Sequence, residues 1–166
     1  MKIYYSFIKG ILLISSLGVY FSCSEPFPEL PPETQSGEGA FGCLVNNELV
    51  FAVRSGNSLY ANATYDVNAN QLKINARCQS EQQFSFIIDD PYKKQDTLID
   101  TLRYLPPDSG EWMEATQTGH FQITRLDSIN NDSHVVSGTF FFDLNETGKT
   151  PIHVTKGRFD LYLNIY

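Results

Sequence analysis

Residues 136–144 have the sequence Val-Ser-Gly-Thr-Phe-Phe-Phe-Asp-Leu, and residues 158–166 have the sequence Arg-Phe-Asp-Leu-Tyr-Leu-Asn-Ile-Tyr. In both stretches apolar residues occupy alternate positions, which is typical of a β-strand with one face in the core. Aromatic and branched side chains, which favour strands, supply most of that face. We therefore expect the segments 140–142 and 159–165 to form the centre of the core.

The same alternation recurs in shorter stretches along the chain, such as 59–67 and 72–78, separated by clusters of turn-forming residues. Residues 111–118 lack it and are predicted to form a loop. No stretch has a convincing helical pattern. Roughly eight or nine short strands predict a single all-β domain over residues 41–166, built as an antiparallel β-sandwich, with a small β-barrel as the alternative.

The N-terminus has the layout of an export signal. Lys2 and Lys9 precede an apolar run over residues 11–21, and the small Ser22 precedes Cys23. The run is shorter than the roughly 20 residues that a membrane-spanning helix needs. Residues 1–22 are therefore predicted to be a lipoprotein signal peptide, with Cys23 as the lipid-carrying first residue of the mature chain. An ordinary secretory signal or an uncleaved anchor is the alternative.

The lipid would attach the protein to a membrane of the cell envelope. Because the residue after Cys23 is Ser24 rather than Asp, the familiar enterobacterial sorting rule predicts the outer membrane. Residues 23–40 are predicted to be a tether between the lipid and the domain. Its prolines oppose helix formation and its glycines add flexibility, at positions Pro26, Pro28, Pro31, Pro32, Gly37 and Gly39.

The charge of the chain limits its partners. The formal net charge is −7, and removal of residues 1–22, with two lysines and no acid, gives −7 − 2 = −9 for the remaining 166 − 22 = 144 residues. An acidic surface argues against nucleic acid as a partner and against broad adhesion to anionic lipid headgroups.

If Cys23 carries lipid, Cys43 and Cys78 remain as a pair. An exported compartment permits a disulfide between them. Two separately buried thiols are the alternative, since a free cysteine packs like a small hydrophobic residue. The two cysteines lack a neighbouring His or Cys and would make a poor metal site.

No catalytic motif is present, so we predict no catalytic residues, no metal and no cofactor. His120, His134 and His153 lie on different predicted strands, and we expect them at surface or half-buried positions. Asp89 and Asp90 are adjacent, so on a strand they would point to opposite faces and would not form a carboxylate pair.

Three short segments resemble known proteins. Residues 34–37 are Thr-Gln-Ser-Gly, residues 41–46 are Phe-Gly-Cys-Leu-Val-Asn, and residues 157–160 are Gly-Arg-Phe-Asp. This pattern resembles small lipoproteins of the Bacteroidota that are classed as domains of unknown function. The chain departs from the pattern at Asn47, where Gly is expected; Asn also tolerates a left-handed backbone, so we expect the turn to form. The resemblance implies envelope localisation and a β fold, and no activity.

Three copies of Asp-(Ser/Thr)-aliphatic are similar to the O-glycosylation acceptor of exported Bacteroidota proteins. They make Thr97, Thr101 and Ser128 candidate acceptors.

Several aromatic residues are predicted on outward faces or loops, at Tyr60, Trp112, Tyr162 and Tyr166. Exposed aromatics can stack on sugar rings or anchor a protein interface, although ordinary cross-strand packing explains such residues equally well. The sequence thus predicts a non-enzymatic binding or structural β-sandwich displayed from the outer membrane, with a protein or glycan partner. A hydrolase or inhibitor that acts on envelope polymers is the alternative.

Overall fold

A computed structural model describes residues 29–52, 61–79, 81–93, 101–114, 119–127 and 134–166, together with the backbone of residues 96–97. This part of the chain contains strands and no helix. The strands are β1 Ala40–Val45, β2 Glu48–Phe51, β3 Ala61–Asp66, β4 Gln71–Arg77, β5 Gln83–Asp89, β6 Asp96–Thr97, β7 Thr101–Leu105, β8 Met113–Glu114, β9 Gly119–Leu126, β10 Val135–Leu144 and β11 Ile152–Ile165.

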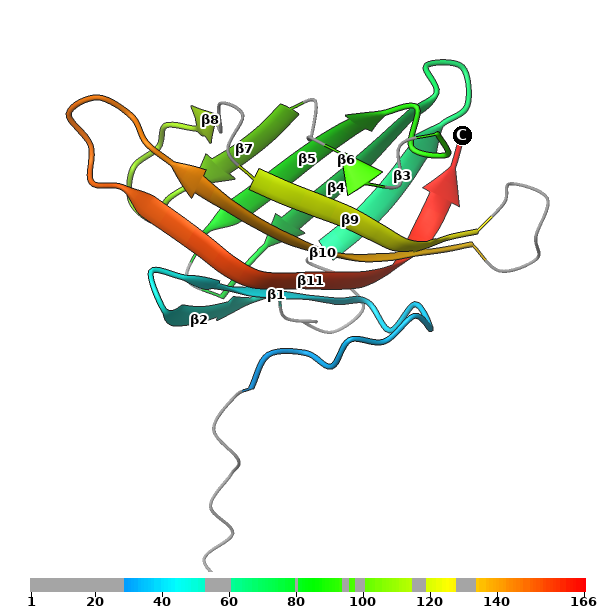
Figure 1. The fold of residues 1–166 in the computed structure, drawn as a ribbon, viewed down its shortest axis with the longest axis horizontal. Coiled ribbons are helices and arrows are strands. Elements are labelled where there is room, and N and C mark those ends of the chain that lie inside the picture. Colours follow the sequence, from blue (N-terminus) through cyan, green and yellow to red (C-terminus); the bar gives the residue numbers. More distant parts are fainter. Residues whose placement is uncertain are drawn as a thin grey trace, which may run out of the picture.

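The strands form two layers that face each other across the core (Figure 1). One layer has the order β2-β1-β11-β10-β9-β6, and the other continues from the end of β11 through β3-β4-β5-β7-β8. Among the described strands, the hydrogen-bonded path from β6 through β11 to β8 is open at both ends, so these strands do not close into a barrel. The predicted all-β sandwich is therefore confirmed.

Strand β11 joins the two layers. Its first part pairs antiparallel with β10 and β1, and its last residues, Leu163–Ile165, pair in parallel with Ala63–Tyr65 of β3. This parallel pair was not predicted. Beyond it, the backbone of Tyr166 exchanges hydrogen bonds with Tyr65 and Val67, so the C-terminus is paired to its last residue.

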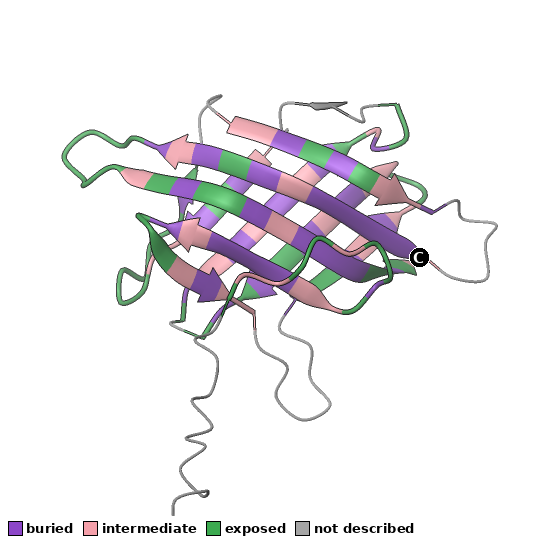
Figure 2. Cartoon of the chain, turned by 60° about the horizontal axis from the view of Figure 1, so that its bottom comes forward, coloured by how far each residue is buried: buried purple, intermediate pink, exposed green. Residues whose placement is uncertain are grey.

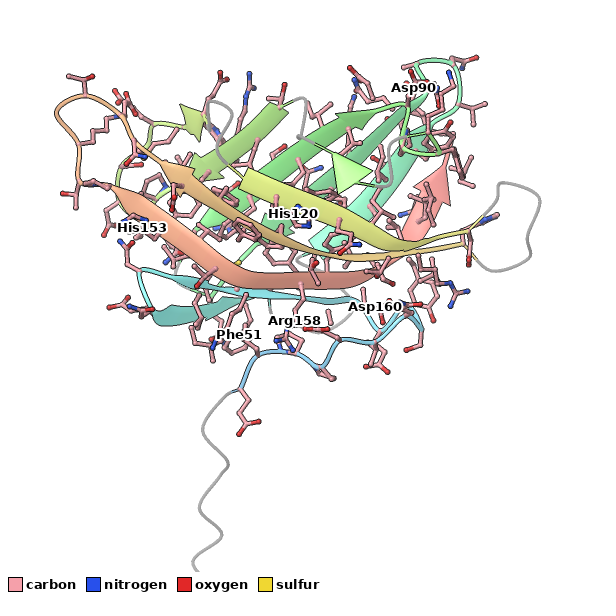
Figure 3. All side chains as sticks on the ribbon, viewed as in Figure 1. Phe51, Asp90, His120, His153, Arg158 and Asp160 are labelled. Carbon is pink, nitrogen blue, oxygen red and sulfur yellow. The ribbon has the colours of Figure 1, made fainter. Side chains whose placement is uncertain are left out.

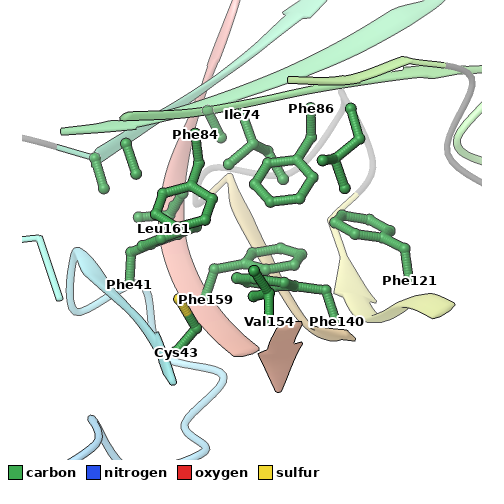
Figure 4. Packing of buried hydrophobic residues seen from close by; sticks show 14 of the residues in the cluster. Phe41, Cys43, Ile74, Phe84, Phe86, Phe121, Phe140, Val154, Phe159 and Leu161 are labelled. Carbon is green, nitrogen blue, oxygen red and sulfur yellow. The ribbon is translucent and has the colours of Figure 1, made fainter. Parts of the chain in front are cut away.

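Phenylalanine rings from both layers form the centre of the core (Figure 4). The ring of Phe140 lies 5.0 Å from that of Phe86 in the opposite layer and 5.3 Å from that of Phe41. Phe142 and Phe159 are also buried, while Phe141 points outward and is 54 % exposed. The predicted core segments are thus confirmed, and burial of each phenylalanine contributes about 1.5–3 kcal/mol. Buried and exposed residues alternate along the strands of the layer that contains β9, β10 and β11 (Figure 2).

Two backbone features let these strands pack closely. A Cβ at Gly157 would lie 2.3 Å from the ring of Phe140, so only glycine fits at this position of β11. Asn46 and Asn47, between β1 and β2, have φ angles of 50° and 69°. Positive φ at both central residues is typical of the tight turns of β-hairpins, so the expected Asn-Asn turn is confirmed.

The middle of the chain differs from the expectation in detail. Residues 111–118 were predicted to be a loop, but Met113–Glu114 form the short edge strand β8 against β7. Met113 is buried beside the core, which explains why this segment is held. Among the described residues, no helix is long and apolar enough to cross a membrane.

Candidate functional site

Residues 31–39, which we call the strap, lie along the outer face of the β1-β11-β10 layer (Figures 1 and 3). The guanidinium of Arg158 donates a 2.8 Å hydrogen bond to the carbonyl of Pro31, and the amide of Gly39 donates a 2.9 Å hydrogen bond to the carbonyl of Asp160. Arg125 donates a further bond to the carbonyl of Gln35. Of the predicted tether over residues 23–40, the last ten residues, 31–40, are therefore attached to the domain.

The carboxylate of Asp160 binds the strap to the sheet. It accepts hydrogen bonds from the hydroxyl of Thr34 at 2.6 Å and from the amides of Ser36 and Gly37 at 3.0 and 2.8 Å. From the sheet side, the hydroxyl of Ser137 donates at 2.6 Å. Asp160 is only 1 % exposed, so nearly all of its hydrogen bonds must come from the protein.

These contacts decide the charge state of Asp160. Burial alone would raise the pKa of this carboxyl, because it disfavours the charged form. The hydrogen bonds from Ser137, Thr34, Gly37 and Ser36 outweigh burial and lower the pKa to about 2. The group is thus a carboxylate at neutral pH, and the strap is held by charge-assisted hydrogen bonds, which are stronger than neutral ones.

The local sequence explains why the strap adopts this shape. Gly37 has a φ of 76°, which lets successive amides of residues 36–38 converge on the carboxylate in the manner of an anion-binding nest. A Cβ at Gly42 would lie 2.6 Å from Pro31, so this glycine lets the strap pass close over β1. The three segments that carry the resemblance to Bacteroidota lipoproteins therefore meet in space: Thr-Gln-Ser-Gly, Phe-Gly-Cys and Gly-Arg-Phe-Asp. Their common role in this chain is to dock the strap.

A second acidic residue supports the strap from the side. Both the Nε and one terminal nitrogen of Arg125 donate 2.8 Å hydrogen bonds to the carboxylate of Asp127, which also accepts one from the amide of Val135. The bond from Arg125 is the main cause of the lowered pKa of Asp127. This pair orients Arg125 toward the carbonyl of Gln35.

A cavity of about 100 Å³ lies between the strap and the sheet. Glu33 and Gln35 line it from the strap, and Thr124, Thr139 and Arg158 line it from β9, β10 and β11. The Nε atom of Arg158 is buried and has no hydrogen-bond partner among the described residues. A buried donor without a partner destabilises a protein by about 1–3 kcal/mol.

The predicted exposed aromatics are found on several separate elements. Trp112, Tyr162 and Tyr166 are 43 %, 58 % and 60 % exposed, and Tyr60 lies outside the described residues. Phe141, which we did not single out, stacks on His120 at a ring distance of 5.4 Å. Tyr162 lies opposite Val135, six residues along β10 from Phe141, so these two rings do not form one continuous strip.

The histidines and paired aspartates also lie apart (Figure 3). His153 binds Asp143 at 2.7 Å on the exposed face of the sheet, whereas Nδ1 of His134 is buried without a partner in the described structure. No group of three His, Cys, Asp or Glu within the described ranges could hold a metal ion. Asp89 accepts a 2.8 Å bond from Gln71, and Asp90 accepts one from Asn70 while its backbone has a φ of 51°.

Cys43 and Cys78 are buried free thiols in this structure. Burial is the main reason why the pKa of Cys78 rises to about 12, and it raises the pKa of Cys43 still further, with a contribution from Cys78 itself. A disulfide between Cys43 and Cys78 remains a prediction.

The modification sites are only partly described. Cys23 and Ser128 lie outside the described residues. Thr97 lies in β6, where its backbone pairs with Phe121, and Thr101 is half-buried in β7 opposite Ile87. Modification of these residues remains a prediction.

Comparisons of the chain with protein-family models, with curated proteins and with solved structures find no match. The resemblance to Bacteroidota lipoproteins rests on the quoted segments.

Proposed function

We propose that this protein is a non-enzymatic lipoprotein of the cell envelope, whose β-sandwich is held at the outer membrane by lipid on Cys23 and binds a protein or glycan partner or has a structural role. The docked strap is the observation that carries this proposal. It fixes the point at which the chain leaves the domain, only 31 − 23 = 8 residues from Cys23.

The strap would set the distance between membrane and domain. Eight residues span at most about 26–29 Å when fully extended, from roughly 3.3–3.6 Å per residue. A free tether ending at residue 40 would span about twice that distance. Lipid on Cys23 would therefore keep the domain close to the membrane surface, with the strap-bearing layer near the point of attachment.

The expected attachment can be measured directly. Intact mass and detergent partitioning of the native protein would be compared with those of Cys23→Ala. A lipid mass increment and membrane partitioning, both lost in the variant, are the expected results. A wild-type protein that carries no lipid and partitions into the aqueous phase would refute the anchor.

The non-enzymatic part of the proposal has its own test. The alternative, a hydrolase or inhibitor acting on envelope polymers, needs convergent carboxylates or histidines in a cleft. The Asp143–His153 pair instead lies on an exposed sheet face. Turnover of an envelope polymer that Asp143→Asn abolishes would replace the binding function with this alternative.

A further inference from the structure

We infer that the cavity between the strap and the sheet is a subsite for one hydroxyl-bearing edge of a neutral sugar, and that an occupant holds the strap against the sheet. This inference rests on the glycan partner of the proposed function and specifies where such a partner would bind.

The walls of the cavity offer several hydrogen-bonding groups without partners. The hydroxyls of Thr124 and Thr139 and the side-chain amide of Gln35 form no hydrogen bond with the described residues. Hydroxyls and amides both donate and accept. A ligand hydroxyl matches this set, because it can donate to one of these groups and accept from another.

The charges around the cavity favour a neutral ligand. Arg158 lies 3.6 Å from the carboxylate of Glu33, and Arg125 is engaged by Asp127 through two 2.8 Å bonds. The carboxylate of Asp160 is enclosed by its donors. Each cation is thus already paired, so the site has no free charge with which to bind an anionic or cationic group.

The volume of the cavity limits how much of a sugar it can hold. The cavity has a volume of about 100 Å³. Pockets that enclose a drug-sized ligand are about 300–1,000 Å³. Two neighbouring hydroxyls or a hydroxymethyl group would fill the space, while the rest of the sugar would extend past Glu33, whose side chain is 66 % exposed at the rim.

An occupant would couple binding to the strap. Its hydroxyls would touch Gln35 on one side and Thr124 and Thr139 on the other, so the sugar would bridge the strap and the sheet. Bound ligand would then slow the opening of the strap and protect the amides of residues 36–38 from hydrogen exchange.

A calorimetric titration would test the inference. The detergent-solubilised full chain would be titrated in turn with maltotriose, xylotriose and chitotriose. Thr139→Val and Thr124→Val keep the shape and strand preference of threonine but remove the hydroxyl. Each is expected to weaken binding about tenfold. Thr155→Val, on the exposed face of β11 away from the cavity, is the matched control and should bind like wild type. Bound sugar should also slow exchange at residues 36–38.

The other outcomes separate the two proposals. Binding that neither cavity variant weakens would refute the subsite and leave a glycan-binding function elsewhere on the domain. If none of the three sugars binds at millimolar concentration, both the subsite and the proposed glycan partner are refuted. A protein partner would then be the remaining form of the binding proposal. Lipid attachment at Cys23 is measured independently of either result.

Discussion

Replacement of Asp160 by Asn tests whether the strap is held by a buried carboxylate. The variant keeps the size of the side chain but removes its charge. Hydroxyl donors can rotate to become acceptors, whereas amide donors cannot. The Oδ1 position faces the amide of Gly37 and the hydroxyl of Ser137, and the Oδ2 position faces the amides of Ser36 and Glu38. The new NH₂ group is therefore expected at Oδ1, where it leaves the Gly37 amide without an acceptor.

The expected loss of unfolding free energy in Asp160→Asn is the sum of two contributions. Lowering the pKa of Asp160 from 3.8 to about 2 corresponds to about 2–3 kcal/mol of preference for the charged form, at ~1.4 kcal/mol per unit. The buried position leaves little room for screening by solvent. One unsatisfied amide adds about 1–3 kcal/mol. We expect Asp160→Asn to lower the free energy of unfolding at pH 7 by about 3–6 kcal/mol.

The same carboxylate predicts a pH dependence with a definite sign. Because its pKa is lower in the folded state than the roughly 3.9 of an unfolded chain, its stabilisation is complete above about pH 5. It is lost as the pH falls toward about 2, where the folded carboxyl takes up a proton. The difference in unfolding free energy between wild type and Asp160→Asn should therefore shrink by about 2–3 kcal/mol between pH 5 and pH 2.

Urea unfolding followed by far-UV circular dichroism at pH 7, 4 and 2.5 measures both quantities, and hydrogen exchange at residues 36–38 shows whether the strap is released. Asp108→Asn is the matched control, since Asp108 is exposed in a turn with a φ of 58° that Asn accepts, and it should change stability by less than about 0.5 kcal/mol. A loss below about 1 kcal/mol in Asp160→Asn, or a loss independent of pH, would refute the assigned role of the carboxylate.

Three further changes test other contacts. Gly37→Ala should cost about 1 kcal/mol more in urea unfolding than Gly110→Ala: both glycines have positive φ, but only a Cβ at Gly37 meets neighbours, at 3.0 Å from Val135. In the reduced, folded protein Cys43 and Cys78 should resist a thiol reagent at pH 8 and react on unfolding, since their raised pKa values disfavour the thiolate; rapid labelling without unfolding would contradict their burial. Deletion of residues 163–166 should lower the unfolding free energy by several kcal/mol, because it removes the parallel pairing with β3; an unchanged urea midpoint would show that this pairing is dispensable.

The fold was largely predictable because burial in a strand depends on alternation, which is a local property of the sequence. Phe140 and Phe142 point inward and Phe141 outward, as the alternating pattern requires. The parallel pairing of β11 with β3 was not predictable in this way. It joins residues about 100 positions apart, and alternation indicates which face of a strand is buried but not which strand lies beside it.

The strap was missed for a related reason. Its prolines and glycines are equally typical of a free linker, and no local pattern shows that the amides of residues 36–38 meet a carboxylate more than 120 positions away. Asp160 alternates regularly with Phe159 and Leu161, so the alternation alone places its side chain on the outer, solvent-facing side of the strand. One sequence signal could have indicated the docked strap. The three segments that carry the resemblance are easier to explain if they contact one another in the fold than if each has a separate role.

In the two proposals above, docking of the strap and recognition of a ligand depend on different residues of this chain. The segments of the Bacteroidota resemblance supply Thr34, Gly37, Gly42 and Asp160, and each of these positions the strap. The cavity hydroxyls come from β9 and β10, which lie outside those segments. A chain with the same strap but other residues at 124 and 139 would therefore be held in the same way and would bind a different ligand. Exchange of these two threonines should alter ligand affinity while the strap amides at residues 36–38 keep their protection in the unliganded protein.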